Sequence, residues 1–167
     1  RRIVGGGEFS VLVNCGPSER EIAREIVAKA NDRRVVALSE EAQLPVGLTK
    51  ACLRRSRLLV TTDGGPRFFG IAFSRPVVTL FGPTDPIRTA TPYDAETCLS
   101  VALDSQPCRA RTCPLGHQRC IRDVSVTCDS DVVAQTHGAA PVEAAAPTQG
   151  AEYAEDPTGP RRGRERR

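Results

Sequence analysis

Two turn sequences have the composition of phosphate-binding loops. Residues 63–66 read Asp-Gly-Gly-Pro and residues 82–86 read Gly-Pro-Thr-Asp-Pro, and each run follows an apolar segment. Glycine lets backbone amides approach a ligand closely because it has no Cβ, and the start of a helix presents unpaired amides that suit a phosphate group. A diphosphate could therefore bind at the two glycines, with the hydroxyl of Thr84 on the second loop. The alternative is an ordinary tight turn in which Asp63 caps the following helix.

A second group of residues has the side-chain types of a metal site. Three thiols and one imidazole are spaced Cys-x4-Cys-x3-His-x2-Cys, at Cys108, Cys113, His117 and Cys120. Such a set is sufficient for a closed, structural zinc site. The spacing differs from the paired Cys-x2-Cys of zinc ribbons, so buried or redox-inert thiols are the alternative, and a catalytic Cys–His pair is a further one. The seven cysteines are an odd number, which favours reduced thiols or metal ligands over a disulfide framework.

Alternating apolar runs and helical patterns must position these residues. We expect strands at residues 11–13, 35–38, 58–62 and 76–81, and helices from about residue 18 to 30, 48 to 55 and 67 to 73. Strands that are apolar throughout and are separated by helices predict a parallel sheet covered on both faces. The predicted fold class is therefore α/β, with a Rossmann-like parallel sheet and flanking helices.

Two details of the expected helices can be compared with the structure. Ser18 and Glu21 have the spacing of a capping box at the start of the first helix, which ends at Asn31. Its apolar stripe consists of Ile22, Ala23, Ile26, Val27 and Ala30. In the second helix, the residues expected to share one face are Leu48, Ala51 and Cys52.

Composition excludes several classes of protein. The 167 residues fit one globular domain with a polar attachment, and the net charge of +3 is too small to indicate a nucleic-acid partner. No window approaches the length of a transmembrane helix and the first residues contain no apolar signal core, so we expect a cytosolic protein. The absence of methionine predicts a fragment or processed chain. Residues 139–167 are rich in Ala, Pro and Arg, which predicts a disordered tail.

Taken together, the two loops resemble a known family. Residues 58–66 (LLVTTDGGP), followed by residues 76–86 (PVVTLFGPTDP), are similar to the C-terminal half of glycosyltransferase family 9, the lipopolysaccharide heptosyltransferases. In that family one strand ends in Asp-Ser/Thr-Gly-Pro and the next ends in Phe-Gly-Pro-Thr. Residues 11–20 and 48–57 resemble the preceding strand and loop and the preceding helix of the family. The resemblance covers about residues 10–125.

The resemblance implies a GT-B enzyme with two Rossmann-like domains, of which this chain is the C-terminal half that binds the nucleotide sugar. The donor would be ADP-heptose, and the acceptor would be a lipid-linked sugar of the lipopolysaccharide type. Transfer would invert the anomeric centre, would require no cofactor, and would take place at the cytoplasmic face of the inner membrane. The catalytic base of the family lies in the N-terminal half, which this sequence lacks, so no catalytic residue is assigned here.

The resemblance also assigns donor-binding residues to positions of this sequence. In the family the Asp-Ser/Thr-Gly loop contacts the donor diphosphate, which corresponds here to Asp63, Gly64 and Gly65. An acidic residue near the donor ribose corresponds to Glu19. Gly64 replaces the usual Ser or Thr, and Phe68 stands where many members have His. Both changes remove a polar side chain, whereas contacts made by backbone amides would survive.

The expected organisation has three parts. Residues 1–106 form the nucleotide-sugar-binding domain, residues 107–138 form a Cys-rich segment with the terminal elements of that domain, and residues 139–167 form the tail. Two other functions remain open from the sequence. One is another GT-B enzyme, such as a nucleotide-sugar epimerase that prefers uridine. The other is a non-catalytic nucleotide-binding or zinc-stabilised module.

Overall fold

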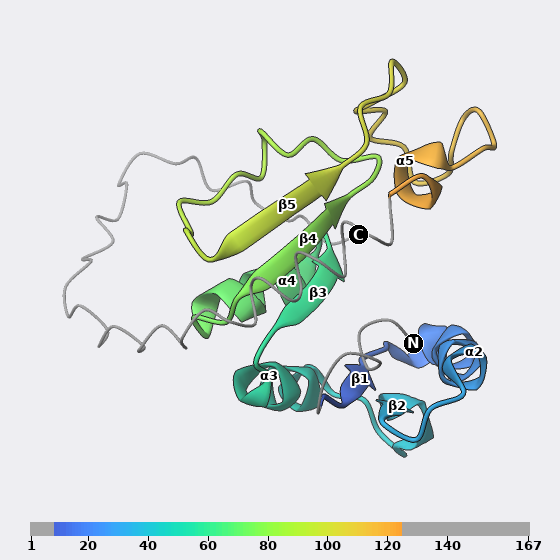
Figure 1. Cartoon of the computed structure of the whole chain (residues 1–167), viewed down its shortest axis with the longest axis vertical. Helices are drawn as coiled ribbons and strands as arrows, with labels where there is room; N and C mark the ends of the chain where they lie inside the picture. The colour runs from blue at the N-terminus through green and yellow to red at the C-terminus, as the bar shows by residue number, and fades with distance from the viewer. Residues whose placement is uncertain (1–8, 125–167) are drawn as a thin grey trace, which may run out of the picture.

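The computed structural model describes residues 9–124, which form an α/β fold of parallel strands connected by helices (Figure 1). The elements, in chain order, are β1 (Val11–Val13), η1 (Pro17–Glu19), α2 (Arg20–Ala30), β2 (Val35–Ala37), η2 (Leu38–Glu40), α3 (Val46–Arg55), β3 (Leu59–Thr62), α4 (Gly65–Ala72), β4 (Val77–Phe81), β5 (Glu96–Ser100) and α5 (Arg119–Arg122). The predicted fold class is confirmed. The predicted tail, residues 139–167, and part of the Cys-rich segment lie outside the described residues.

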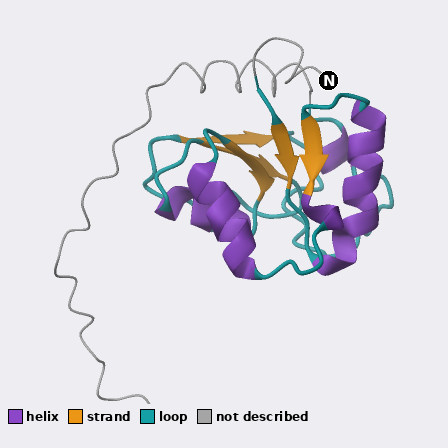
Figure 2. Cartoon of the chain, turned by 90° about the horizontal axis from the view of Figure 1, so that it is seen from below, coloured by secondary structure: helices purple, strands orange, loops and turns teal. Residues whose placement is uncertain are grey.

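The strands form two parallel groups. In the larger group β4 lies between β3 and β5, with Thr62 opposite Leu80 and Phe81 opposite Ser100 at the carboxyl ends. In the smaller group β1 pairs with β2. Figure 2 shows the strands in the middle of the molecule, with helices on both sides of them. Because β3 and β4 are parallel neighbours, the loops that follow them leave the same edge of the sheet.

The most completely buried strand is β4. Val77, Val78, Thr79 and Phe81 are fully buried, as expected for a central strand with an apolar sequence. A second cluster lies between α2 and the smaller strand group, where Cys15, Ala23 and Leu38 are buried together. Leu48 and Cys52 of α3 pack against this second cluster. Of the predicted apolar strands, β4 is therefore the one that is buried, whereas β1, β2 and β3 each keep at least one exposed apolar residue.

The start of α2 differs from the prediction. The backbone N–H of Gly16 donates to Oε2 of Glu19 at 2.7 Å, so the capping interaction is made two residues earlier than the expected pair of Ser18 and Glu21. A single 3₁₀ turn, η1, leads into the helix because Pro17 at its first position provides a preset φ angle. The helix ends as predicted at Asn31, which adopts the left-handed conformation.

The apolar stripe of α2 is only partly buried. Ala23 is in the core, whereas the residues Ile22 and Ile26 are 62% and 44% exposed. The other two residues of the stripe, Val27 and Ala30, are half-buried, so the smaller side chains of the stripe face the strands. In α3, the predicted common face is also only partly correct, because Ala51 is exposed and Leu53 is buried.

Strand β5 was not predicted from the sequence. It reads Glu-Thr-Cys-Leu-Ser, which lacks the continuous apolar run of the other strands, and it lies at the edge of its sheet.

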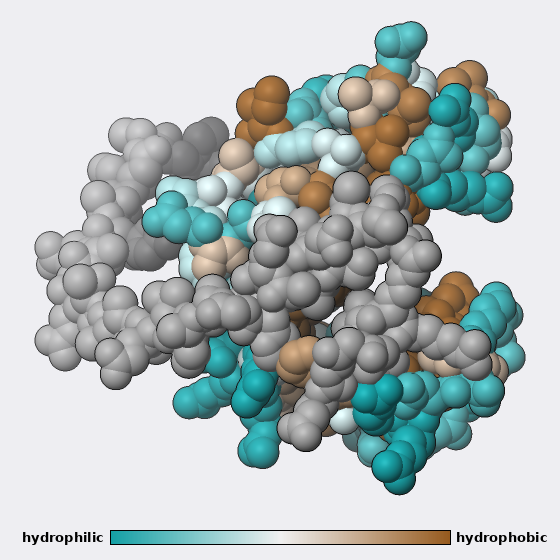
Figure 3. Space-filling model, viewed as in Figure 1, coloured by the Kyte–Doolittle hydropathy of each residue, from teal (hydrophilic) through white to brown (hydrophobic). Residues whose placement is uncertain are grey.

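None of the helices in residues 9–124 is long and apolar enough to span a bilayer. In Figure 3, hydrophobic residues lie beside hydrophilic ones in the region of α5. Leu115 and Ile121, in this part of the chain, are exposed.

Candidate donor-binding site

The loop between β3 and α4 leaves its glycine backbone open. Gly64 is extended (φ −172°) and precedes the first helical residue, Gly65. A Cβ added at Gly65 would have no other atom within 4 Å, and one added at Gly64 would meet only the ring of Pro66 at 4.0 Å. The carbonyl of Gly64 accepts the first turn's hydrogen bond from the Arg67 amide at 3.1 Å. Within residues 9–124 the amides of Gly64 and Gly65 point to no protein acceptor, so they can receive an anion.

Asp63 lies beside these glycines, but its carboxylate is occupied. Oδ1 accepts a hydrogen bond from Arg67 Nη1 at 3.0 Å, and Oδ2 accepts one from the hydroxyl of Thr89 at 3.3 Å. The Asp63 side chain is only 8% exposed. The buried Asp63 side chain therefore anchors the loop to Arg67 and Thr89. The part of the loop that is open to a ligand is the backbone of the two glycines.

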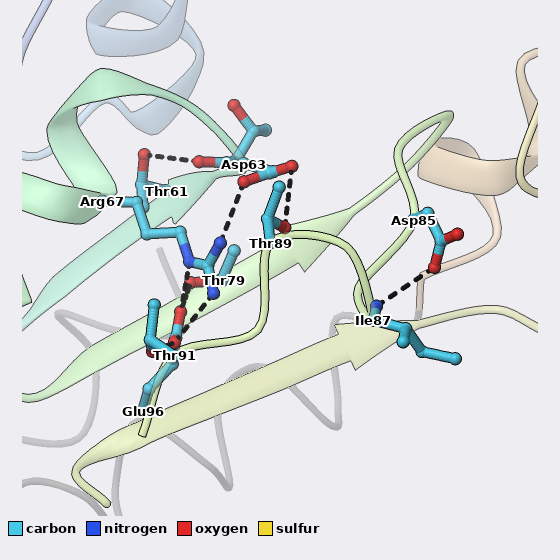
Figure 4. Close-up of polar contacts among 10 residues, drawn as sticks. Thr61, Asp63, Arg67, Thr79, Asp85, Ile87, Thr89, Thr91 and Glu96 are labelled. Atoms are coloured by element: carbon cyan, nitrogen blue, oxygen red, sulfur yellow. Dashed lines mark hydrogen bonds and ion pairs between the residues drawn. The ribbon is translucent and has the colours of Figure 1, made fainter. Parts of the chain in front are cut away.

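Arg67 connects two buried carboxylates. Its side chain is fully buried, and its Nε and Nη2 atoms donate to the two carboxylate oxygens of Glu96 at 2.6 and 2.9 Å. Figure 4 shows the guanidinium between Asp63 on one side and Glu96 on the other. Burial raises the pKa of Glu96, but hydrogen bonds from Arg67, Thr79 and Thr91 outweigh it and hold the pKa below its usual value. Sequence reasoning missed this pair, although a single Arg in an apolar helix, four residues after Asp63, was a possible signal.

The second loop, residues 82–86, is held by a different set of contacts. Asp85 accepts from the Ile87 amide at 3.0 Å and from Arg109 Nη2 at 2.9 Å, and the Arg109 hydrogen bond is the main reason why the pKa of Asp85 is lowered. Asp85 lies apart from the Arg67 network in Figure 4. Thr84 lines an open depression of about 410 Å³ whose other lining residues include Ser100, Asp104 and Gln106. The structure thus places Thr84 on a concave surface beyond the carboxyl ends of β4 and β5.

The Cys-rich segment packs on this second loop. The Arg109 amide of the segment donates to the carbonyl of Pro83 at 2.8 Å, and Gln106, directly before the segment, donates from Nε2 to the carbonyl of Gly82. A Cβ on Gly82 would lie 2.5 Å from Cδ1 of Ile121 on α5, so a glycine is needed for that close contact. The segment therefore serves, at the least, as a support for residues 82–86.

The predicted zinc ligands are not brought together. No three His, Cys, Asp or Glu side chains within residues 9–124 form a group that could hold a metal ion. Cys113 instead accepts a hydrogen bond from the Gln118 amide at 3.4 Å, and this is the main cause of its lowered pKa. Nδ1 of His117 accepts from the Arg119 amide at 3.0 Å. Zinc binding by Cys108, Cys113, His117 and Cys120 stays a prediction.

Glu19 and Phe68 complete the set of predicted positions. Glu19 follows β1, in the other strand group, and its carboxylate accepts the Gly16 amide. The Phe68 side chain, on the first turn of α4, is exposed at the start of the helix and stacks on Arg67, whose guanidinium carbon lies 5.2 Å from the ring centre. Of the predicted donor-binding residues, the structure brings Asp63, Gly64 and Gly65 into one loop and places Thr84 on the loop after the neighbouring strand.

Comparison with known proteins gives consistent results. Residues 2–119 match the family glycosyltransferase family 9 (heptosyltransferase). Two proteins named lipooligosaccharide heptosyltransferase 2, from Campylobacter jejuni serotypes O:2 and O:6, are 28% and 27% identical over 118 residues, which is 68% of this chain and 36% of each relative. The solved structure of E. coli ADP-heptose lps heptosyltransferase II superposes with a TM-score of 0.66 at 18% identity, over 81% of this chain and 38% of that one. The chain thus spans just over a third of the length of these relatives and shares the fold of part of a solved heptosyltransferase.

Proposed function

Because the chain belongs to glycosyltransferase family 9, the heptosyltransferase family, we propose that it binds a nucleotide-activated heptose, ADP-heptose, as the sugar donor. The observation that carries this proposal is the open backbone of Gly64 and Gly65 at the start of α4. Two amides without a protein acceptor, at the positive end of a helix, suit the negative charge of a diphosphate.

Two further predicted residues, on other loops, would contact the rest of the donor. Thr84 offers a hydroxyl on the depression beyond β4 and β5, and Glu19 is the candidate for the donor ribose. The carboxylate of Asp63 acts on the loop and not on the donor, because its side chain is only 8% exposed and is hydrogen-bonded to Arg67 and Thr89. Backbone amides therefore supply the diphosphate contacts, which fits the loss of the hydroxyl at position 64.

The reaction in which the donor takes part is inverting transfer of the sugar to a lipid-linked acceptor of the lipopolysaccharide type. The enzyme would act at the cytoplasmic face of the inner membrane as a peripheral protein, and no metal is required in this scheme. The acceptor pocket and the general base would come from a second, N-terminal domain, since the active site of a GT-B enzyme lies between its two domains. Residues 9–124 by themselves are therefore expected to bind the donor without turnover.

Calorimetric titration of the chain with ADP, UDP and ADP-heptose tests the proposal. We expect binding of ADP and ADP-heptose and weaker binding of UDP. Gly65→Val is the informative variant, because no atom outside the neighbouring residues and the helix's own backbone lies within 4 Å of the Cβ position, yet the new side chain would stand beside the amides. We expect at least about a tenfold loss of ADP affinity, which corresponds to about 1.4 kcal/mol.

Gly47→Val is the matched control, since Gly47 also lies in the first turn of a helix and has no atom within 4 Å of its Cβ position. This variant should bind ADP like the parent chain. Preference for UDP would instead support an epimerase-like enzyme. If no nucleotide bound at millimolar concentration, the donor proposal would be contradicted for this chain.

A further inference from the structure

Arg67 is the most deeply buried charged side chain among the described residues, yet donor binding as proposed above does not use it. Its side chain is 0% exposed, although it belongs to the first turn of α4, two residues after Gly65. Burial of a guanidinium is costly unless its donors are paired, because the charge loses its water. Such a residue requires an explanation at this position.

The contacts of Arg67 fix the guanidinium in three dimensions. Three of its nitrogens reach two carboxylates on different elements, Glu96 at the start of β5 and Asp63 at the end of β3. The aromatic rings of Phe68 and Phe81 lie 5.2 and 5.1 Å from the guanidinium carbon. Both the position and the plane of the guanidinium are therefore determined by its surroundings.

The same contacts link the donor loop to the rest of the sheet. Asp63 Oδ1 is held by Arg67, and Oδ2 is held by Thr89 in the connection between β4 and β5. Thr79 on β4 and Thr91 in that connection donate to the Glu96 carboxylate. Figure 4 shows these side chains converging beneath the loop. Arg67 thus contacts Asp63, which directly precedes Gly64.

We infer that Arg67 is a positioning residue of the donor site, which holds Asp63 so that the amides of Gly64 and Gly65 face the donor diphosphate. The inference rests on the function proposed above. Arg67 itself touches no ligand. Its planar fork is required, because a lysine ammonium carries the same charge but cannot donate side by side to Glu96 and also reach Asp63.

The decisive variant is Arg67→Lys, compared with Arg24→Lys. Arg24 is also hydrogen-bonded to two carboxylates, Glu40 and Glu21, but it lies on the exposed surface of α2. In the ligand-free chain, we expect Arg67→Lys to shift the amide resonances of Gly64 and Gly65 in a ¹⁵N–¹H spectrum, while those of Gly47 and Gly116 stay in place. ADP affinity should fall about tenfold, measured well below the melting temperature of each variant. Arg24→Lys should change neither readout.

Thr89→Val provides a second test if Arg67→Lys does not fold. It removes the hydroxyl that donates to Asp63 Oδ2 and keeps the volume of the side chain, and it should shift the same two glycine resonances by a smaller amount.

The outcomes separate this inference from the proposed function. If the parent chain binds ADP and Arg67→Lys binds it equally well with unmoved glycine resonances, the inference is wrong and the proposed function stands. If the parent chain binds no ADP, the proposed function fails, and the ligand-free spectra still decide whether Arg67 orients the loop. A loss of stability without a change in affinity or in these resonances would show a merely structural role and would overturn the inference.

Discussion

At the scale of single residues, Gly64 is the position where this chain departs most clearly from its family pattern. The family has Ser or Thr there, in a loop that resembles residues 63–66. Gly64 is the N-cap of α4 and is extended, a backbone conformation that any residue adopts. The nearest atom to an added Cβ is the Pro66 ring at 4.0 Å, so a serine fits without a clash.

Gly64→Ser should therefore improve both binding and stability. The hydroxyl adds a hydrogen-bond donor for the diphosphate, and a serine N-cap is better than glycine by a few tenths of a kcal/mol. We expect ADP to bind several-fold more tightly in calorimetry and the thermal midpoint to rise slightly. An unchanged or weaker ADP affinity would indicate that the diphosphate does not lie at this loop.

At the scale of elements, the position of α4 depends on a close contact between the helix and two strands. A Cβ at Gly70 would lie 2.7 Å from Cδ2 of Leu59 on β3 and 3.1 Å from Cγ2 of Val77 on β4. Val77 is fully buried in the central strand, so it has no space into which to move. This contact sets the height of α4 above the sheet and, with it, the height of the glycine loop at the start of the helix.

Gly70→Ala should destabilise the protein although alanine favours helix. The propensity gain of about 1 kcal/mol is outweighed by overpacking, which costs about 1–3 kcal/mol. We expect a net decrease of about 1 kcal/mol in the free energy of unfolding, measured by urea denaturation. Gly47→Ala in α3 serves as the control, because its Cβ position is empty and the same substitution should stabilise there. Equal effects at both positions would contradict the close packing of α4.

At the scale of the whole molecule, the buried pair of Arg67 and Glu96 couples stability to pH. The pKa of Glu96 is lowered in the folded state, so the folded chain binds fewer protons than the unfolded chain between the two pKa values. The stabilisation from this group is complete above its ordinary pKa of about 4.3. It is lost as the pH falls through the lower, folded-state value.

Glu96→Gln should reduce the acid dependence of folding. At pH 7 the variant should be less stable than the parent, because Arg67 loses one of its two anionic partners while staying buried. Between pH 5 and pH 3 its free energy of unfolding should decrease less steeply than that of the parent. Chemical denaturation at several pH values measures both slopes. Glu25→Gln, which removes an exposed carboxylate paired with Lys29, should leave the slope close to that of the parent, and an identical slope for Glu96→Gln would contradict the prediction.

Some elements of this fold could be predicted from short stretches of the sequence. Apolar runs predicted β1, β2, β3 and β4 to within one residue at either end, because each run is short, apolar and bounded by polar or turn residues. The loop of Asp63, Gly64 and Gly65 was also predicted from its composition. Strand β5 was missed, since its polar sequence becomes a strand only by pairing with β4. Ile22 and Ile26 stay exposed although they belong to the apolar stripe of α2, because periodicity does not define which part of the stripe meets the strands.

The sequence by itself determined the family, the parallel α/β class and the two glycine-containing loops, because those features depend on short runs of neighbouring residues. Only the tertiary structure decided what the charged side chains do. Asp63 and Glu96 are 33 positions apart in the sequence and meet on one guanidinium, and such a meeting depends on strand order and register. The same folding leaves Cys108, Cys113, His117 and Cys120 without a common centre among the described residues. Spacing along a chain shows which groups are available, and the packing of the elements determines which of them come into contact.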